Sequence, residues 1–192
     1  MNHVIVYCHP AKESFNMALV ETYTEELKKS GHTVAVRNLY SSGFQPVLTQ
    51  EEYEQSLAFM YSTDIKKEQE LLTWCDCLTL IYPVWWGGMP ALLKGYIDRV
   101  FSYGFAYELD GEEPIPQLKG KSAVSICTTG TPSEIYEKNG MHHAMNLARD
   151  HSIFEFCGME VKRSIYFGNV IHSPESERER MLQCVRSLGS SF

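Results

Sequence analysis

Five short runs of mostly apolar, β-branched residues recur along the chain, separated by longer segments with a helical repeat of apolar positions. A run without regular polar alternation is typical of a strand buried on both faces of a parallel sheet. The runs cover residues 3–8, 33–36, 77–82, 122–128 and 161–167. Strands that alternate with helices predict an α/β fold, in which right-handed crossovers place helices on both faces of the sheet.

The helical segments begin at residues that favour helix starts. Ser14 is an expected N-cap, and Thr49 followed by Glu52 has the spacing of a capping box. Ser173 is a further expected N-cap, because Pro174 after it suits the first helical position. Other helices are expected over 64–74, 89–101 and 141–156. Residues 103–120, with three glycines and two prolines, are expected to form a long connection.

The composition limits the class of protein. The 192 residues carry a net charge of −7 and scattered basic residues, so no nucleic-acid-binding face is expected. No apolar run approaches the roughly 20 residues of a membrane helix. The N-terminus enters a strand directly, without a basic region or cleavage signal. Since no repeat or linker interrupts the pattern, we expect one cytoplasmic domain over 1–192 that does not insert into membranes.

The six cysteines are expected to be buried free thiols, because cytoplasmic proteins rarely form disulfides. Cys75 and Cys77 are the one close pair, and the second pair that a zinc site needs is missing. We therefore expect no metal site.

The loops after the first, third and fourth runs are expected to meet at one edge of the sheet. The carboxyl ends of parallel strands lie together, and ligands bind in the crevice beyond them. The first of these loops, 9–14, offers a hydroxyl, an imidazole and backbone N–H groups at a helix N-terminus, which suits a phosphate. It lacks a G-x-G-x-x-G or Walker pattern, so a Rossmann or triphosphate site is not indicated. Taken alone, this loop is also explained by a capped helix.

The other two loops offer an aromatic surface and hydrogen-bond donors. Trp85 and Trp86 precede two glycines, a combination that provides flat apolar contact and a close backbone approach, although core or dimer packing explains two tryptophans equally well. The loop after the fourth run continues to Tyr136 and His142. A phosphate site, a flat wall and donors that face developing negative charge together fit a flavin.

The motifs that form these loops resemble the NAD(P)H:quinone oxidoreductase family of flavodoxin-like flavoproteins, including the modulator-of-drug-activity and potassium-efflux ancillary quinone reductases. The motifs are HPAKESFN (9–16), YPVWWGGMPALLKGYIDRVF (82–101), GFAY (104–107) and the TTG at 128–130 that precedes a tyrosine and a histidine. The resemblance implies a flavodoxin-like, five-stranded parallel sheet of order 2-1-3-4-5 and a homodimer with two active sites at its interface. It also implies tightly bound FAD or FMN, and ping-pong hydride transfer from NAD(P)H to the flavin and then to a quinone or similar acceptor.

The resemblance carries roles to individual positions. Contacts to the flavin phosphates fall on His9, Ser14, Phe15 and Asn16. Residues beside the ring system are Pro83, Val84, Trp85 and Trp86, and those at its polar edge are Thr128, Thr129 and Gly130. Tyr136 and His142, six residues apart as in the family motif, match the pair implicated in hydride transfer. Tyr107 would overhang the pocket of a partner subunit.

The chain departs from the family pattern at three places. Thr131 stands where the family has a second glycine, and Leu109 stands where some relatives have a second pocket aromatic. The sequence stops at Phe192, without the C-terminal extension that helps larger relatives to enclose an FAD adenosine. FMN is therefore an alternative to FAD, and the preferred acceptor stays open.

Two other functions are compatible with the sequence. Some relatives regulate membrane ion-transport systems, so the chain is alternatively a redox-sensing subunit that binds a membrane transport protein. A one-electron carrier like flavodoxin is a weaker alternative, because a carrier has less need of the pair Tyr136 and His142 and of a large aromatic loop.

Overall fold

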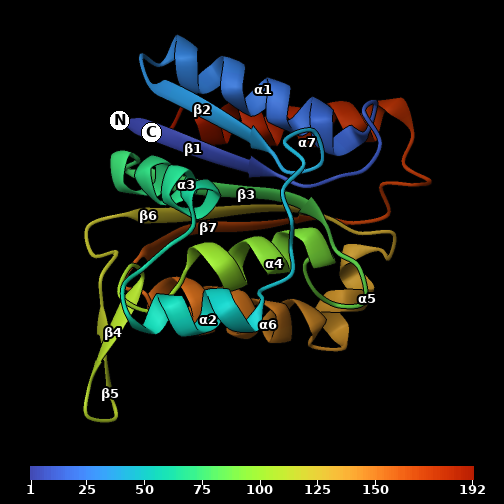
Figure 1. Cartoon of the computed structure of the whole chain (residues 1–192). Coiled ribbons are helices and arrows are strands. Elements are labelled where there is room, and N and C mark those ends of the chain that lie inside the picture. The colour runs from blue at the N-terminus through green and yellow to red at the C-terminus, as the bar shows by residue number, and fades with distance from the viewer.

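A parallel sheet of five strands forms the centre of the computed structural model, which describes residues 1–192 (Figure 1). The strands lie in the order β2-β1-β3-β6-β7. Their bounds are β1 (Asn2–Tyr7), β2 (Thr33–Asn38), β3 (Cys77–Pro83), β6 (Ser122–Thr128) and β7 (Glu160–Phe167). All seven residues of β3 and all seven of β6 are buried, which explains why these two runs have no polar alternation.

Two layers of helices cover the sheet (Figure 1). On one face lie α1 (Phe15–Lys29) and α7 (Glu175–Gly189), which share a core with the sheet. On the other face, α3 (Thr63–Trp74), α4 (Ala91–Val100) and the segment η1 (Leu147–Glu155) share the larger core. Within β3, Leu78, Leu80 and Tyr82 belong to the larger core and Ile81 to the other, as the period of two along a strand requires.

The connection 103–120 contains a hairpin that the sequence did not predict. Strands β4 (Tyr107–Asp110) and β5 (Glu113–Pro116) pair antiparallel around Gly111, which has a φ of 64°. These two short strands lie outside the parallel sheet and take two numbers, so the fourth and fifth predicted runs are β6 and β7. The predicted order 2-1-3-4-5 therefore appears as 2-1-3-6-7 in the numbering of all seven strands.

Two of the predicted N-caps are confirmed, although the capping box expected at one of them is incomplete. Ser14 caps α1, since its Oγ accepts a hydrogen bond of 3.2 Å from the N–H of Met17. Thr49 likewise caps α2 (Gln50–Leu57) by accepting from the N–H of Glu52. The Glu52 carboxylate does not complete the capping box, because it binds the guanidinium of Arg99 at 2.8 and 2.9 Å instead.

The predicted start of the last helix is wrong by one residue. Helix α7 begins at Glu175, with Pro174 as its extended N-cap rather than its first helical residue. The hydroxyl of Ser173 donates to the carbonyl of Asn169, four residues before it, and so does not cap the helix.

The segment predicted as one helix over 141–156 changes its hydrogen-bond pattern part-way. It begins as α6 (Met141–Asn146) and continues as the π-helix η1, whose wider turn places Arg149 and Phe154 in the interior. A short helix, α5 (Ser133–Lys138), precedes α6 where only a loop was expected. No helix in the structure has the length and apolar character needed to cross a bilayer. Five cysteines are buried free thiols, whereas Cys184 is exposed, so the expectation of burial was wrong for that residue.

Candidate active site

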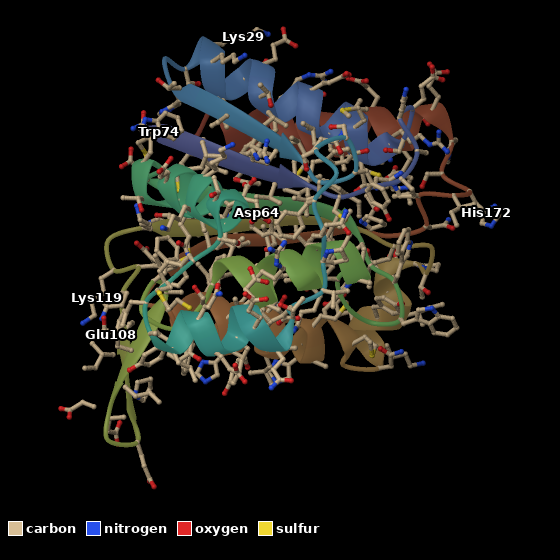
Figure 2. The ribbon with its side chains drawn as sticks, viewed as in Figure 1. Lys29, Asp64, Trp74, Glu108, Lys119 and His172 are labelled. Atoms are coloured by element: carbon tan, nitrogen blue, oxygen red, sulfur yellow. The ribbon has the colours of Figure 1, made fainter.

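Three loops meet beyond the carboxyl ends of β1, β3 and β6, where α5 also lies (Figure 1). They are residues 8–14, 84–90 and 129–132. The backbone of Val84 donates to the carbonyl of Thr128, so the second loop is attached to the end of β6. Figure 2 labels His172 at this end of the molecule and Trp74 and Glu108 at the opposite end.

A tight turn holds the two tryptophans of the second loop. Trp85 and Gly88 exchange two backbone hydrogen bonds of 3.0 Å, and the central residues Trp86 and Gly87 have φ values of 52° and 76°. Positive φ at both central positions is the mark of a type I′ turn. For a bulky residue, a positive φ costs on the order of 1 kcal/mol or more. Trp86 is fully exposed, so burial of its side chain does not offset this cost. Strain of this kind at a loop tip indicates a functional constraint.

The first loop lies next to this turn. The imidazole of His9 is 6.4 Å from the ring of Trp85, centroid to centroid. Its Nδ1 accepts a hydrogen bond of 3.1 Å from the N–H of Ala11, which fixes the path of the loop. At the end of the loop, the hydroxyls of Tyr7 and Ser14 are 2.8 Å apart.

The start of α1 presents free backbone donors. Phe15 and Asn16 precede the first intrahelical bond, which the N–H of Met17 makes to Ser14, and their own N–H groups donate to no atom of the chain. Arg178 of α7 adds a positive charge, with its guanidinium carbon 6.0 Å from the centre of the Phe15 ring. Helix N-termini and arginines both favour anions. Sequence reasoning missed Arg178, because nothing in the chain connects α7 with a loop more than a hundred residues away.

The side chain of Asn16 points inward rather than toward this anion site. It is 4% exposed, and its amide donates a hydrogen bond of 2.9 Å to the buried Thr128 hydroxyl. The pair therefore joins α1 to the end of β6. Thr129 is also buried, and its hydroxyl donates to the carbonyl of Thr131. Of the three residues predicted at the polar edge of a ligand, only Gly130 is exposed, with a backbone N–H that donates to no atom of the chain.

The predicted pair Tyr136 and His142 comes together in α5 and α6. Their ring centroids are 5.8 Å apart and the planes are nearly perpendicular. The Nε2 atom of His142 is buried and has no hydrogen-bond partner in the chain. An orphaned imidazole nitrogen beside a tyrosine is a polar group that a ligand can satisfy.

A buried polar network contacts the His142 ring through Tyr166, and no pattern in the sequence predicts it. The imidazole stacks on Tyr166 with centroids 4.5 Å apart and planes at 18°. The Tyr166 hydroxyl accepts from Arg149 at 3.0 Å and donates to Asn146 at 2.8 Å. Burial raises the pKa of Tyr166 to about 12, against the opposing effect of Arg149, so this hydroxyl keeps its proton at neutral pH. Burial likewise raises the pKa of Tyr82, which receives a second hydrogen bond from Arg149.

These features fit a flavin. The turn at 85–88 offers a flat aromatic surface, the start of α1 offers donors for phosphate, and Gly130 and His142 offer unpaired polar atoms.

The comparisons with known proteins agree with this fit. A family model described as the flavodoxin-like fold matches residues 1–190. The ribosyldihydronicotinamide dehydrogenase [quinone] of Mus musculus is 34% identical over 93% of this chain and 86% of its own length. The NAD(P)H:quinone oxidoreductase of Methanothermobacter marburgensis superposes with a TM-score of 0.92 at 32% identity, covering 99% of this chain and 98% of that one.

The chain belongs to the NAD(P)H:quinone oxidoreductase family. It is accordingly an oxidoreductase, in agreement with its similarity to an NAD(P)H oxidoreductase of Haemophilus influenzae, which is 33% identical over 95% of this chain and 91% of its own length. An azoreductase of Bacillus anthracis has the same fold at 17% identity, with a TM-score of 0.78 and full coverage of both chains.

One residue that the family pattern assigns to the site lies far from these loops. Tyr107 is half-buried in β4, with its ring against Tyr103 and Phe156. Its neighbour Glu108 is labelled in Figure 2 at the end of the sheet opposite the loops. Tyr107 instead lines a groove of about 550 Å³ between α2 and the hairpin, together with Leu109. The single chain therefore does not bring Tyr107 to its own candidate site.

Proposed function

We propose that this protein is a flavin-dependent NAD(P)H:quinone oxidoreductase in which residues 1–192 form one flavin-binding domain. The observation that carries the proposal is the exposed aromatic turn at Trp86, beside the free N–H donors of α1 and the orphaned Nε2 of His142. A bound FAD or FMN supplies two-electron transfer between NAD(P)H and an acceptor. The buried free thiols are compatible with a cytoplasmic location.

The residues have separate roles in this proposal. His9, Ser14 and the N–H groups of Phe15 and Asn16 bind the flavin phosphates, and the Arg178 guanidinium adds charge there. Pro83, Val84, Trp85 and Trp86 lie beside the flat ring system and exclude water from one side of it. Gly130, two residues after Thr128 at the end of β6, donates its N–H to the polar edge of the ring. Thr128 and Thr129 position this loop.

Tyr136 and His142 stabilise negative charge by donating hydrogen bonds from the phenol and the imidazole. Such donors act where charge develops during the reaction, and a site closed to bulk water makes them stronger. Because the His142 ring makes no hydrogen bond within the chain, a hydrogen bond from the imidazole to a ligand breaks no existing bond.

The active unit in this proposal is a homodimer. The groove that contains Tyr107 is lined by the exposed apolar side chains of Tyr53, Leu57 and Leu109, and the exposed Phe59 packs against Tyr103 of the same groove. Clusters of this kind mark interaction surfaces, and a second copy of the chain would cover it and bring Tyr107 to the partner's acceptor pocket. Sedimentation of the Leu57→Asp variant tests this assembly: the parent is expected to sediment as a dimer and the variant as a monomer.

Steady-state turnover with a soluble quinone tests the proposed reaction. NAD(P)H and the quinone use one face of the ring in turn, so double-reciprocal plots at several quinone concentrations are expected to be parallel. The relative from mouse carries the name of a quinone-dependent dehydrogenase, which supports quinone as the acceptor class. Intersecting plots would contradict a shared face. Absence of turnover with any quinone, after incubation with both flavins, would contradict the reaction itself.

A further inference from the structure

Arg149 lies at the centre of a buried hydrogen-bond network between the sheet and α6. It is 3% exposed. Its Nη1 donates to the hydroxyls of Tyr82 and Tyr166 at 3.0 Å each, and its Nη2 donates to Ser164 at 2.8 Å and to Asn146 at 3.1 Å. One guanidinium thereby connects β3, β7 and α6.

The guanidinium has no donor left for a ligand. An arginine has five N–H groups, and every nitrogen of Arg149 already donates to the chain. Its Nε donates to Asp150 at 2.7 Å, and the second carboxylate oxygen accepts from Nη2 at 3.1 Å. Asp150 is the acidic partner that compensates the buried charge. The function of Arg149 therefore lies in the groups that it holds.

Tyr166 is held at its hydroxyl by two bonds of opposite direction, one accepted from Arg149 and one donated to Asn146. The Arg149 guanidinium carbon also lies 5.5 Å from the centre of the Tyr166 ring. These contacts fix both the position and the plane of the ring. The face of that ring is the surface on which His142 stacks.

His142 makes no side-chain hydrogen bond of its own. Its ring is held by the face of Tyr166 and by the perpendicular ring of Tyr136. Its orientation, and hence the direction of the unpaired Nε2, depends on these two rings. Displacement of a reacting group by about 1 Å can cost about 100-fold in rate, so an imidazole held in this way depends on a rigid support.

A π-helix contributes to the arrangement. Segment η1 begins one residue after Asn146, and its wider turns place Arg149 in the interior beneath Tyr166. π-Helical turns are rare in proteins, and those that occur are often found at functional sites. In many proteins a buried ion pair can be replaced by apolar residues without loss of stability. The stability of the fold alone therefore does not explain why this polar network is present.

We propose that Arg149 and Tyr166 are positioning residues that fix the imidazole of His142 in its reactive orientation. The proposal rests on the role of His142 in the proposed function. Tyr166 acts by its ring face, and Arg149 acts by fixing Tyr166 through the hydroxyl. In this proposal neither residue needs to contact the substrate or the flavin directly.

Histidine NMR tests the positioning without reference to activity. The purified protein, with whatever flavin it retains, is labelled at its seven histidines, and the His142 signals are assigned with the His142→Gln variant. Stacking on Tyr166 is expected to shift these ring protons upfield. In Tyr166→Leu the upfield shift is expected to vanish, and in Tyr166→Phe and Arg149→Met the signals are expected to broaden and move. The matched control is Arg37→Met, which removes an arginine paired with the buried Glu68 of α3 and leaves the His142 signals in place.

Kinetics of the same variants tests the consequence. Tyr166→Phe is expected to lower kcat about 10-fold with KM for NAD(P)H nearly unchanged, as for an interaction made only in the transition state. Combined with His142→Ala, it is expected to cause no further loss, because both changes remove one effect. The positioning proposal is overturned if His142 signals in Tyr166→Phe and in folded Arg149→Met match the parent, or if the two rate losses multiply. If His142→Ala alone leaves the rate unchanged, the role of His142 in the proposed function fails, and the NMR result still decides whether Tyr166 and Arg149 orient it.

Discussion

The imidazole of His142 lies nearly flat on the ring of Tyr166, with centroids 4.5 Å apart and planes at 18°. The Tyr166 hydroxyl is fixed in turn by Arg149 and Asn146. In the proposed function, this support holds the imidazole of His142, whose Nε2 has no partner in the chain, in position for a ligand.

Loss of the donors on Tyr136 and His142 is expected to slow reduction of the bound flavin. Tyr136→Phe and His142→Ala each remove one hydrogen bond to developing charge, so anaerobic stopped-flow should give rates about 10- to 100-fold below the parent. The flavin content should not change, because neither side chain lies at the phosphate site. Parental rates in both variants would show that this pair has no part in the reaction.

The backbone strain at Trp86 predicts a gain in stability when it is relieved. Trp86→Asn places a residue that tolerates positive φ at a φ of 52°, and the free energy of unfolding of the flavin-free protein is expected to rise by about 1 kcal/mol. The same variant should bind flavin more weakly, because the aromatic surface is lost. Trp86→Phe is the matched control, with unchanged stability and near-parental affinity. Urea unfolding and flavin fluorescence measure the two effects, and unchanged affinity in Trp86→Asn would argue against contact with the ring.

The sequence was sufficient for the sheet and for the three loops, since both depend on local pattern. The runs in β3 and β6 are apolar because both faces are buried. The N-cap at Ser14 depends on a hydrogen bond to a residue only three positions further along the chain. The hairpin over 107–116 was missed, because its two prolines and Gly111 resemble an irregular connection.

Side chains whose partners are distant in sequence could not be assigned. The side chain of Asn16 binds Thr128, 112 residues away, and only its backbone N–H stays available for the predicted phosphate contact. Arg149 has neighbours from three separate strands, and no spacing in the chain indicates them. Long-range polar contacts carry no local period, which is why the network around His142 appears only in the structure.

The contact between Asn16 and Thr128 is expected to matter for stability. Asn16→Ala leaves the buried Thr128 hydroxyl without its partner, which should lower the free energy of unfolding by about 1–3 kcal/mol. Adding Thr128→Val removes the orphaned hydroxyl and should recover part of that loss. Urea unfolding of the two single variants and the double variant measures the coupling. Strict additivity would mean that the two side chains do not depend on each other.

His3 predicts a loss of stability at acidic pH. Its ring is fully buried with both nitrogens unpaired, and burial, followed by the charges of His32 and the N-terminus, lowers its pKa to about 4, with Asp76 opposing. Below about pH 6.5 the unfolded chain therefore binds a proton on His3 that the folded chain excludes. The free energy of unfolding is unaffected by this group above about pH 6.5 and falls as the pH drops toward 4. The fall should reach roughly 3 kcal/mol. His3→Gln should show a smaller difference between pH 7.5 and pH 5 in urea unfolding, and an equal difference would contradict this origin.

The visible absorption spectrum of the purified protein, before and after anaerobic addition of NAD(P)H, is the most direct test of the site built by Trp86, the start of α1 and His142. The protein is expected to be yellow, as isolated or after incubation with FAD or FMN, and NAD(P)H should bleach the flavin band within the time of mixing, with colour returning on addition of a quinone. The proposed function would be contradicted by a protein that retains neither flavin, or by a bound flavin whose absorption band does not change when NAD(P)H is added.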